Sequence, residues 1–116
     1  DIALDADPIE ASPDHAVSLG IVVNELVGNA AKYAFVGLDH GTVTITLRST
    51  VDGGYALTVC DDGHGFDPND GPKGTGLGMR IVAAVSRSLG CEIERMPSDR
   101  GTCYRCMVAT NNPKPD

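Results

Sequence analysis

Aromatic residues and long apolar runs are scarce in this sequence. Only 4% of the 116 residues are aromatic and none is tryptophan, whereas hydrophobic residues of all kinds make up 41%. A chain of this length encloses one core but not two, so we expect a single domain. No apolar run approaches the roughly 18 residues of a membrane-spanning helix, and no charged-then-apolar leader opens the chain. We therefore expect a soluble cytoplasmic domain that makes no membrane contact.

Positive charge is also sparse. Nine Lys and Arg residues are scattered among 16 Asp and Glu residues, and the formal net charge is -7. A nucleic-acid surface needs clustered Lys and Arg to neutralise phosphates, so this composition disfavours a nucleic-acid partner. Binding of an anionic ligand would require backbone amides or a metal ion to stabilise its negative charge.

Cysteine is present, but not in the spacing of a metal site. The chain has four cysteines, of which Cys103 and Cys106 form one C-x-x-C pair, and a zinc site would need a second pair or histidines at ligand spacing. The segment "TCYRCMVA" is typical of a strand, which puts Cys103 and Cys106 on opposite faces and disfavours a redox motif. We expect ordinary buried or free thiols in a reducing cytoplasm.

Hydrophobic periodicity and turn residues divide the chain into helices and strands. Ser12 and Pro13 suit the N-cap and first residue of a helix, and Gly90 suits a C-cap. The segment "VDGG" suits a hairpin connection. In chain order we expect a strand at 2–5, a helix at 14–35, a strand pair at 42–50 and 55–61, a helix at 79–90, and a strand pair at 91–96 and 102–110.

This order predicts a two-layer α/β sandwich. Strand pairs without crossovers form antiparallel hairpins, so the sheet is expected to be mixed, with both helices on one face. The domain is predicted to span residues 1–110, and the tail at 111–116 has little that could pack and is expected to fray. The core face of the first helix is predicted from an apolar stripe of Leu19, Val23, Leu26, Ala30 and Ala34.

The first helix also carries a polar face. At about 100° per residue, Glu25, Asn29 and Lys32 cluster in an arc roughly opposite the apolar stripe. The arc is either a solvated surface or a site, because a carboxylate, an amide oxygen and an ammonium group together suit a metal ion and phosphates. Gly28 lies beside it and serves either close helix packing or clearance for a ligand.

Two glycine-rich segments follow the second hairpin strand. In "DDGHGF" (61–66) a strand delivers Asp61 to its end, where a carboxylate could accept a hydrogen bond from an exocyclic amino group and so distinguish adenine from guanine. In "GTGLGMR" (74–80) a string of amides enters a helix, which suits phosphate. Neither segment matches the P-loop or the dinucleotide fingerprint.

Together the three segments resemble the Bergerat-fold ATPases, the group that contains gyrase, Hsp90, histidine kinases and MutL. "NELVGNAAKYAF" resembles the N-box, "DDGHGF" the D-x-G-x-G box and "GTGLGM" the second glycine box. The motifs stand in the family order, and the resemblance covers about residues 5–109. The segment around the N-box is particularly similar to bacterial sensor histidine kinases of the HWE and HisKA_2 classes.

The resemblance implies Mg²⁺ and ATP as cofactors and a role for each matching residue. Asn29 would bind Mg²⁺, and Glu25 would act through water or polarise the acceptor. Lys32 would meet phosphates and Tyr33 would lie along the nucleotide. Asp61 would accept from adenine. The other implied ATP-binding residues are Gly63, Gly65, Gly74, Thr75, Gly76, Leu77, Gly78 and Thr102, the last of which is equally well explained as a strand residue.

The resemblance departs from the usual histidine kinase pattern at two points. Only eight residues, "FDPNDGPK", separate Gly65 from Gly74, so the lid is short and no F-box is present. Glu25 stands where many histidine kinases carry asparagine, and glutamate there also occurs in gyrase-type members and in anti-sigma serine kinases.

The nucleophile for phosphoryl transfer is not apparent. His15, His40 and His64 lack the helical, acid-flanked setting of a phospho-acceptor and are expected to be structural or exposed. The resemblance therefore implies a histidine kinase catalytic domain, a transferase, that acts on a histidine of a separate helical dimerisation domain and signals to a response regulator. An anti-sigma-type serine kinase and a non-catalytic nucleotide-binding or docking domain remain alternatives.

Overall fold

The computed structural model describes residues 1–8, 12–35, 37–38, 40–51, 53–64, 77–96 and 101–109. These residues form a five-stranded mixed sheet covered by helices, in the order β1-β2-β3-β5-β4. The elements are β1 (Ile2–Ala6), α1 (Pro13–Asn29), η1 (Ala30–Ala34), β2 (Val43–Ser49), β3 (Tyr55–Asp61), α2 (Leu77–Ser88), β4 (Ile93–Met96) and β5 (Thr102–Val108). The expected two-layer α/β sandwich is confirmed.

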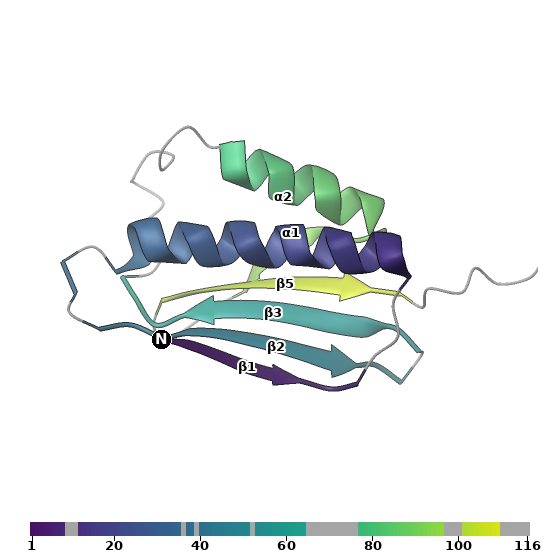
Figure 1. Cartoon of the computed structure of the whole chain (residues 1–116), viewed down its shortest axis with the longest axis horizontal. Helices are drawn as coiled ribbons and strands as arrows, with labels where there is room; N and C mark the ends of the chain where they lie inside the picture. Colours follow the sequence, from purple (N-terminus) through teal and green to yellow (C-terminus); the bar gives the residue numbers. More distant parts are fainter. Residues whose placement is uncertain are drawn as a thin grey trace, which may run out of the picture.

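Both long helices lie on one face of the sheet, as expected, with α1 and α2 side by side (Figure 1). β1 pairs parallel with β2, and the other neighbouring strands pair antiparallel. The helices leave the β1 edge largely uncovered, since Ile2 and Leu4 are 64% and 70% exposed. Among the described residues, no helix has the length and apolar character needed to cross a membrane.

The start of α1 follows from its capping residues. Ser12 is the N-cap and its hydroxyl accepts from the backbone N–H of His15 at 3.2 Å, which satisfies one of the donors that a helix start leaves unpaired. Pro13, the first helical residue, has no N–H to leave unpaired. Toward the other end, α1 passes into the π-helical turn η1, a variation that is frequent at functional sites.

The core lies between the helices and one face of the sheet. Side chains alternate along β3, so that Tyr55, Leu57 and Val59 are buried while the residues between them are not. On α1 the buried positions are Val22 and Leu26, and Ala30 is buried at the start of η1. Val22 lies outside the predicted stripe, because α2 packs beside α1 and widens the covered face of the helix.

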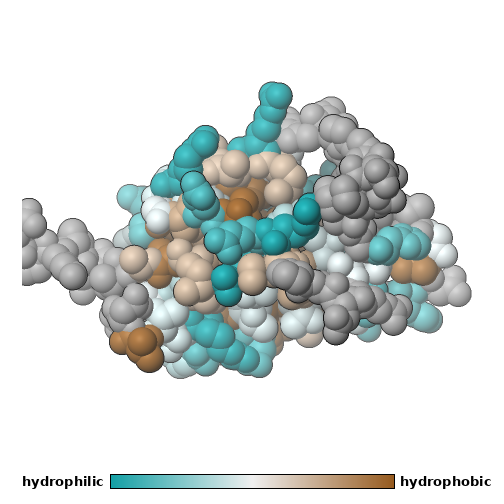
Figure 2. Space-filling model, turned by 180° about the vertical axis from the view of Figure 1, so that it is seen from behind, coloured by the Kyte–Doolittle hydropathy of each residue, from teal (hydrophilic) through white to brown (hydrophobic). Residues whose placement is uncertain are grey.

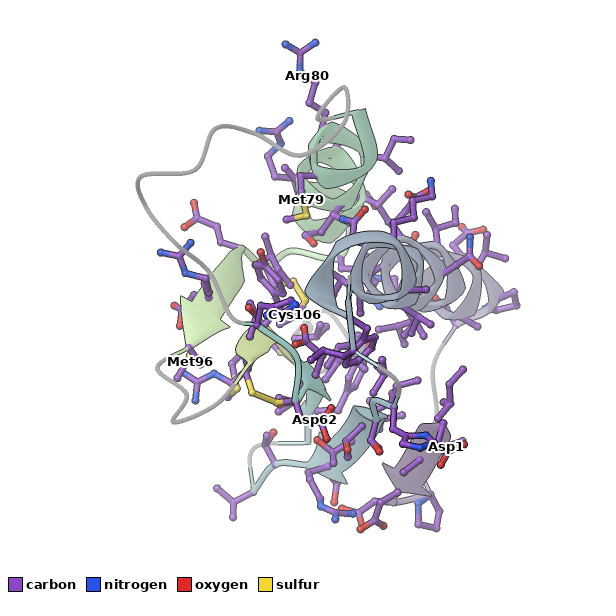
Figure 3. All side chains as sticks on the ribbon, turned by 90° about the vertical axis from the view of Figure 1, so that its left-hand side faces the viewer. Asp1, Asp62, Met79, Arg80, Met96 and Cys106 are labelled. Atoms are coloured by element: carbon purple, nitrogen blue, oxygen red, sulfur yellow. A yellow bond between two sulfur atoms is a disulfide. The ribbon has the colours of Figure 1, made fainter. Side chains whose placement is uncertain are left out.

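The expectation of free thiols is wrong. The structure has no free cysteine among its described residues: Cys60 is bonded to Cys103 and Cys91 to Cys106. Cys103 and Cys106 do lie on opposite faces of β5, as the strand pattern predicts. Each therefore meets a different partner, Cys60 directly across the β3–β5 ladder and Cys91 just before β4. Cys106 is fully buried at the centre of the end-on view in Figure 3.

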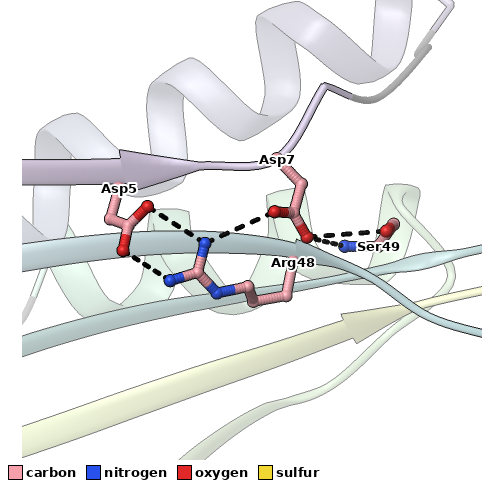
Figure 4. Close-up of polar contacts among 4 residues, drawn as sticks. All are labelled: Asp5, Asp7, Arg48 and Ser49. Atoms are coloured by element: carbon pink, nitrogen blue, oxygen red, sulfur yellow. Dashed lines mark hydrogen bonds and ion pairs between the residues drawn. The ribbon is translucent and has the colours of Figure 1, made fainter.

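Figure 2 shows the side opposite to that of Figure 1, where hydrophilic residues surround a moderately hydrophobic area near the centre and strongly hydrophobic residues appear in small separate patches. An ion-pair cluster fastens the edge strand β1 to β2 (Figure 4). The guanidinium of Arg48 pairs with both carboxylate oxygens of Asp5 and reaches Asp7 at 3.5 Å. The hydrogen bond and the charge of Arg48 lower the pKa of Asp5.

This lowered pKa predicts an acid-dependent contribution to stability. The stabilisation is present above the unfolded-state pKa of an aspartate, about 3.9, and is lost as the pH falls through the lower folded-state value. The variant Arg48→Met should therefore unfold at a slightly lower temperature than the parent at about pH 6, and the two should converge at about pH 2. Because all three side chains are exposed, molar salt should also shrink the difference. A gap that persisted in acid would contradict this assignment.

Candidate functional site

Four elements converge at one end of the fold. The last residues of α1, the first residues of α2, the end of β3 and the beginning of β5 all lie at the left-hand end of Figure 1. Figure 3 views this end directly: Met79 points from α2 toward α1, and Arg80 points away from both. The topology therefore brings together the described parts of three sequence motifs that are separated along the chain.

The N-box residues of α1 face the beginning of α2. A Cβ added to Gly78 would lie 3.0 Å from Oε2 of Glu25 and 3.4 Å from Oδ1 of Asn29. The Nδ2 group of Asn29 donates to the sulfur of Met79 at 3.4 Å. Glu25 and Asn29 are half-buried, so the first helix does not present them as a solvated surface. A side chain at position 78 would therefore lie directly against Glu25 and Asn29.

The carboxylate of Asp61, at the end of the central strand β3, is held by backbone amides. Its Oδ1 accepts from the N–H of Gly63 at 3.0 Å and from the N–H of Thr102 at 3.3 Å. Thr102 is the register partner of Asp61 on β5. Gly101 has φ +77°, and a Cβ there would overlap the carbonyl oxygen of Asp61. Gly101 and Thr102 thus lie directly against Asp61, and the amide of Thr102 helps to fix one of its oxygens.

The carboxylate of the next residue, Asp62, binds the backbone of the residue that precedes β2. Oδ1 of Asp62 accepts from the N–H of Thr42 at 2.8 Å, and the N–H of Asp62 donates to the carbonyl of Thr42 at 3.2 Å. These bonds continue the pairing of β2 and β3 by one residue. The adjacent carboxylates of Asp61 and Asp62 therefore accept from different backbone amides.

The remaining predicted residues divide between described and undescribed positions. Lys32 is exposed on η1, and Gly63 is buried. Tyr33 lies in η1 and Leu77 begins α2. The segment 65–76, which holds Gly65, Gly74, Thr75 and Gly76, lies outside the described residues, as does the tail at 111–116.

Two other expectations concern glycine and histidine. A Cβ on Gly28 would meet no described atom within 4 Å, so close helix packing does not explain this glycine. His40 and His64 are exposed, as expected, and His15 is half-buried.

The sequence interpretation missed two residues that help to form the candidate site. Met79 orients the amide of Asn29, and Gly101 permits the close approach of β5 to Asp61. A glycine just before a strand that returns from a hairpin was a usable signal for Gly101. No sequence signal distinguishes Met79 from any apolar residue of a helix, because its contact is made 50 residues away.

The variant Gly78→Ala tests the closeness of α1 and α2. The added methyl group meets the end of the flexible Glu25 side chain, while alanine improves helix propensity by about 1 kcal/mol. We expect the free energy of unfolding to change by less than about 1 kcal/mol, with the Glu25 carboxylate displaced. Thermal unfolding and the side-chain NMR signals of Asn29 would measure the two effects separately. Strong destabilisation would contradict the prediction.

Comparisons with known proteins agree with this arrangement. A family model described as "Histidine kinase-, DNA gyrase B-, and HSP90-like ATPase" matches residues 14–112. The chain is 34% identical to Blue-light-activated histidine kinase 2 of Erythrobacter litoralis over an alignment 116 residues long. The alignment covers 97% of this chain and 33% of that protein. The chain therefore spans about a third of the length of this relative.

Solved structures show the same fold. The histidine kinase domain of a blue-light-activated histidine kinase from Erythrobacter litoralis superposes with a TM-score of 0.81 at 28% identity, covering 92% of this chain and 53% of that one. The Acinetobacter baumannii histidine kinase AdeS gives a TM-score of 0.73 at 22% identity, covering 96% and 54% of the respective chains. At that identity the second match supports the fold alone.

The chain belongs to the histidine kinase-, DNA gyrase B- and HSP90-like ATPase family. The relative and the Erythrobacter litoralis structure reported above are histidine kinases. Membership of the ATPase family implies ATP binding.

Proposed function

We propose that this chain is the catalytic domain of a two-component sensor histidine kinase, which binds Mg²⁺ and ATP and transfers the γ-phosphate to a histidine on a separate helical domain. The observation that carries the proposal is the convergence of Glu25, Asn29 and Gly78 beside the strand ends that hold Asp61. The catalytic domain would span residues 1–110.

The residues at the α1–α2 contact fit a magnesium ion. Oδ1 of Asn29 and Oε2 of Glu25 lie against the same position of α2, and oxygen ligands are those that Mg²⁺ prefers. Because the Nδ2 group donates to Met79, the oxygen of the Asn29 amide is left to act as an acceptor. The described residues contain no cluster of three or more His, Cys, Asp or Glu that could hold a metal, which suits an ion bound by few protein groups and by phosphates. When bound, Mg²⁺ would neutralise phosphate charge during transfer.

The nucleotide base would be recognised at Asp61. One carboxylate oxygen already accepts two backbone amides, which leaves the second oxygen to accept from the exocyclic amino group of adenine. Guanine presents a carbonyl oxygen at the corresponding position and would face the carboxylate without a donor. Thr102 and Gly63 would border the base, and Tyr33 would lie along the nucleotide.

The phosphates would be held by the second glycine box and by Lys32. Backbone amides from Gly74, Thr75, Gly76, Leu77 and Gly78 would lead into the N-terminus of α2, where the helix dipole favours anions. Lys32 is exposed on η1, just beyond Asn29. Together these groups would compensate locally for a chain whose net charge is -7.

The acceptor and the downstream partner belong to the proposal as well. His15 lies near the beginning of α1, at the end away from the candidate site, and His40 and His64 lie outside the helices. The accepting imidazole would therefore come from a helical dimerisation domain. Glu25 would polarise this nucleophile or bind the metal through water. A response regulator would then receive the phosphoryl group, and the site would work in the cytoplasm.

A serine-directed kinase is the second candidate, because Glu25 at this position is also compatible with a protein serine acceptor. The chemistry of the product distinguishes the two reactions. A phosphohistidine is hydrolysed in acid, whereas a phosphoserine survives it.

Calorimetry of nucleotide binding to this chain tests the proposal. We expect a non-hydrolysable ATP analogue to bind in the presence of Mg²⁺, to bind more weakly without it, and to be preferred over the GTP analogue. Addition of a helical acceptor domain and ATP should then yield acid-labile phosphate on that domain. Acid-stable phosphate would support the serine kinase, and the absence of nucleotide binding would leave the non-catalytic docking domain.

A further inference from the structure

A disulfide lies directly behind the residues that hold the candidate base-recognition carboxylate. Cys60 immediately precedes Asp61 on β3, and Cys103 immediately follows Thr102 on β5. Cys60 and Cys103 are register partners with Cα atoms 4.1 Å apart, and Asp61 and Thr102 are the next partners along the ladder. The covalent bond is thus one residue from the hydrogen bond that Thr102 donates to Asp61.

This position matters because the ladder ends there. β3 ends at Asp61 and β5 begins at Thr102, and the last pair of a ladder opens more readily than central pairs. Gly101, the residue before Thr102, already contacts the backbone of Asp61. The Cys60–Cys103 cross-link, one pair before the end of the ladder, therefore restrains β3 and β5 next to the hydrogen bond between Thr102 and Asp61.

We propose that Cys60 and Cys103 are positioning residues for base recognition. Their disulfide keeps the Thr102 amide on Oδ1 of Asp61, so that the other oxygen is aimed at the base. A dithiol reductant would convert the bridge to two thiols, supplying two electrons and two protons and becoming a disulfide itself. Reduction would let the end pair fray, and the preference for ATP over GTP would fall. The proposal rests on the proposed function, since it assigns the base to Asp61.

The second disulfide provides a matched control. Cys91 and Cys106 are 8% and 0% exposed, whereas Cys60 and Cys103 are half-buried. Cys106 lies four residues beyond Thr102 on β5, about 13 Å along an extended strand. Loss of this bridge should lower the stability of the whole domain without a selective effect at Asp61, and limited reductant should open the more accessible bridge first.

The test compares Cys60→Ala/Cys103→Ala with Cys91→Ala/Cys106→Ala. The first measurement is hydrogen exchange of the Thr102 amide without nucleotide, with the amide of buried Leu26 in α1 as internal reference. We expect the first variant to exchange Thr102 about tenfold faster relative to Leu26. The second measurement is calorimetry, in which the first variant should bind Mg²⁺ and ATP about three- to tenfold more weakly and lose part of its preference over GTP. The control variant should match the parent in both respects.

Unchanged Thr102 exchange and unchanged nucleotide preference in Cys60→Ala/Cys103→Ala would overturn the proposal. If the control variant does not fold, the parent chain is instead reduced stepwise and reoxidised, with the open bridge identified by mass spectrometry. Opening of the 60–103 bridge must then change Thr102 exchange reversibly, or the proposal fails. If the parent binds neither nucleotide, the proposed function fails, and the exchange measurement alone decides whether the bridge positions Asp61.

Discussion

The variant Asp61→Asn should weaken binding of Mg²⁺ and ATP by about 10- to 100-fold, because a hydrogen bond to a charged group contributes about 1.5–3 kcal/mol. The amide oxygen of asparagine can still accept from Gly63 and Thr102. The fold should therefore persist, with an unfolding temperature within a few degrees of the parent. The second oxygen, however, is replaced by an NH₂ group that repels the amino group of adenine. Calorimetry with ATP and GTP analogues measures the loss.

Asp62→Asn is the control for this experiment. It makes the same change of charge one residue further along the chain, and its amide oxygen can keep the 2.8 Å bond from Thr42. We expect near-parental affinity for ATP. Equal losses in the two variants would indicate an effect of net charge, and parental affinity in Asp61→Asn would refute the assignment of the base to Asp61.

The variant Asn29→Asp should reduce phosphoryl transfer by about 100-fold or more, the scale expected when one preorganised electrostatic group is lost from a reaction site. Aspartate is almost the same size, so packing against Gly78 is kept. It removes the donor to Met79 and sets a second carboxylate beside Glu25. The like charges oppose each other and repel phosphate. Single-turnover transfer from ATP to the helical domain would measure the effect, with circular dichroism confirming the fold.

Asn24→Asp supplies the matched control on the same helix. Asn24 is exposed, and it is separated from Asn29 by more than one turn of α1. The variant has the same added charge, and we expect its transfer rate to stay within about twofold of the parent, since an exposed charge in water is well screened. Undiminished transfer by Asn29→Asp would remove Asn29 from the proposed metal site.

The end of β3 shows which features of the site can be predicted from the sequence and which cannot. The sequence predicts a strand that ends at Asp61, and strand alternation puts Asp61 on the same face as Tyr55, Leu57 and Val59. The structure shows that these three residues are buried. The pattern does not reveal what holds the carboxylate. Its partners are the amides of Gly63, two residues away, and of Thr102, 41 residues away. Only the register of β3 against β5 brings the second amide into place.

The first helix likewise has some features that the sequence predicts and others that depend on the tertiary structure. Its capping residues and apolar stripe predict its beginning and its core face, and the spacing of Glu25 and Asn29 puts them on a common side. The stripe omitted Val22, and the polar arc was compatible with open solvent. Both features depend on α2, which follows some 50 residues later and covers that side of α1. A helix repeat describes the angular positions of residues, but it contains no information about the neighbour.

The sequence by itself determined the local features of this protein: the caps at Ser12 and Gly90, the hairpin turns, the order of strands and helices, and the three motifs that indicate a family. Each depends on residues close together in the chain, whose conformational preferences act over a few positions. The tertiary structure alone decided the pairing of the four cysteines, the anchoring of Asp61 by Thr102, and the contact of Asn29 with Gly78 and Met79. These depend on strand register and helix packing, which follow from burial of the whole core and not from any single segment.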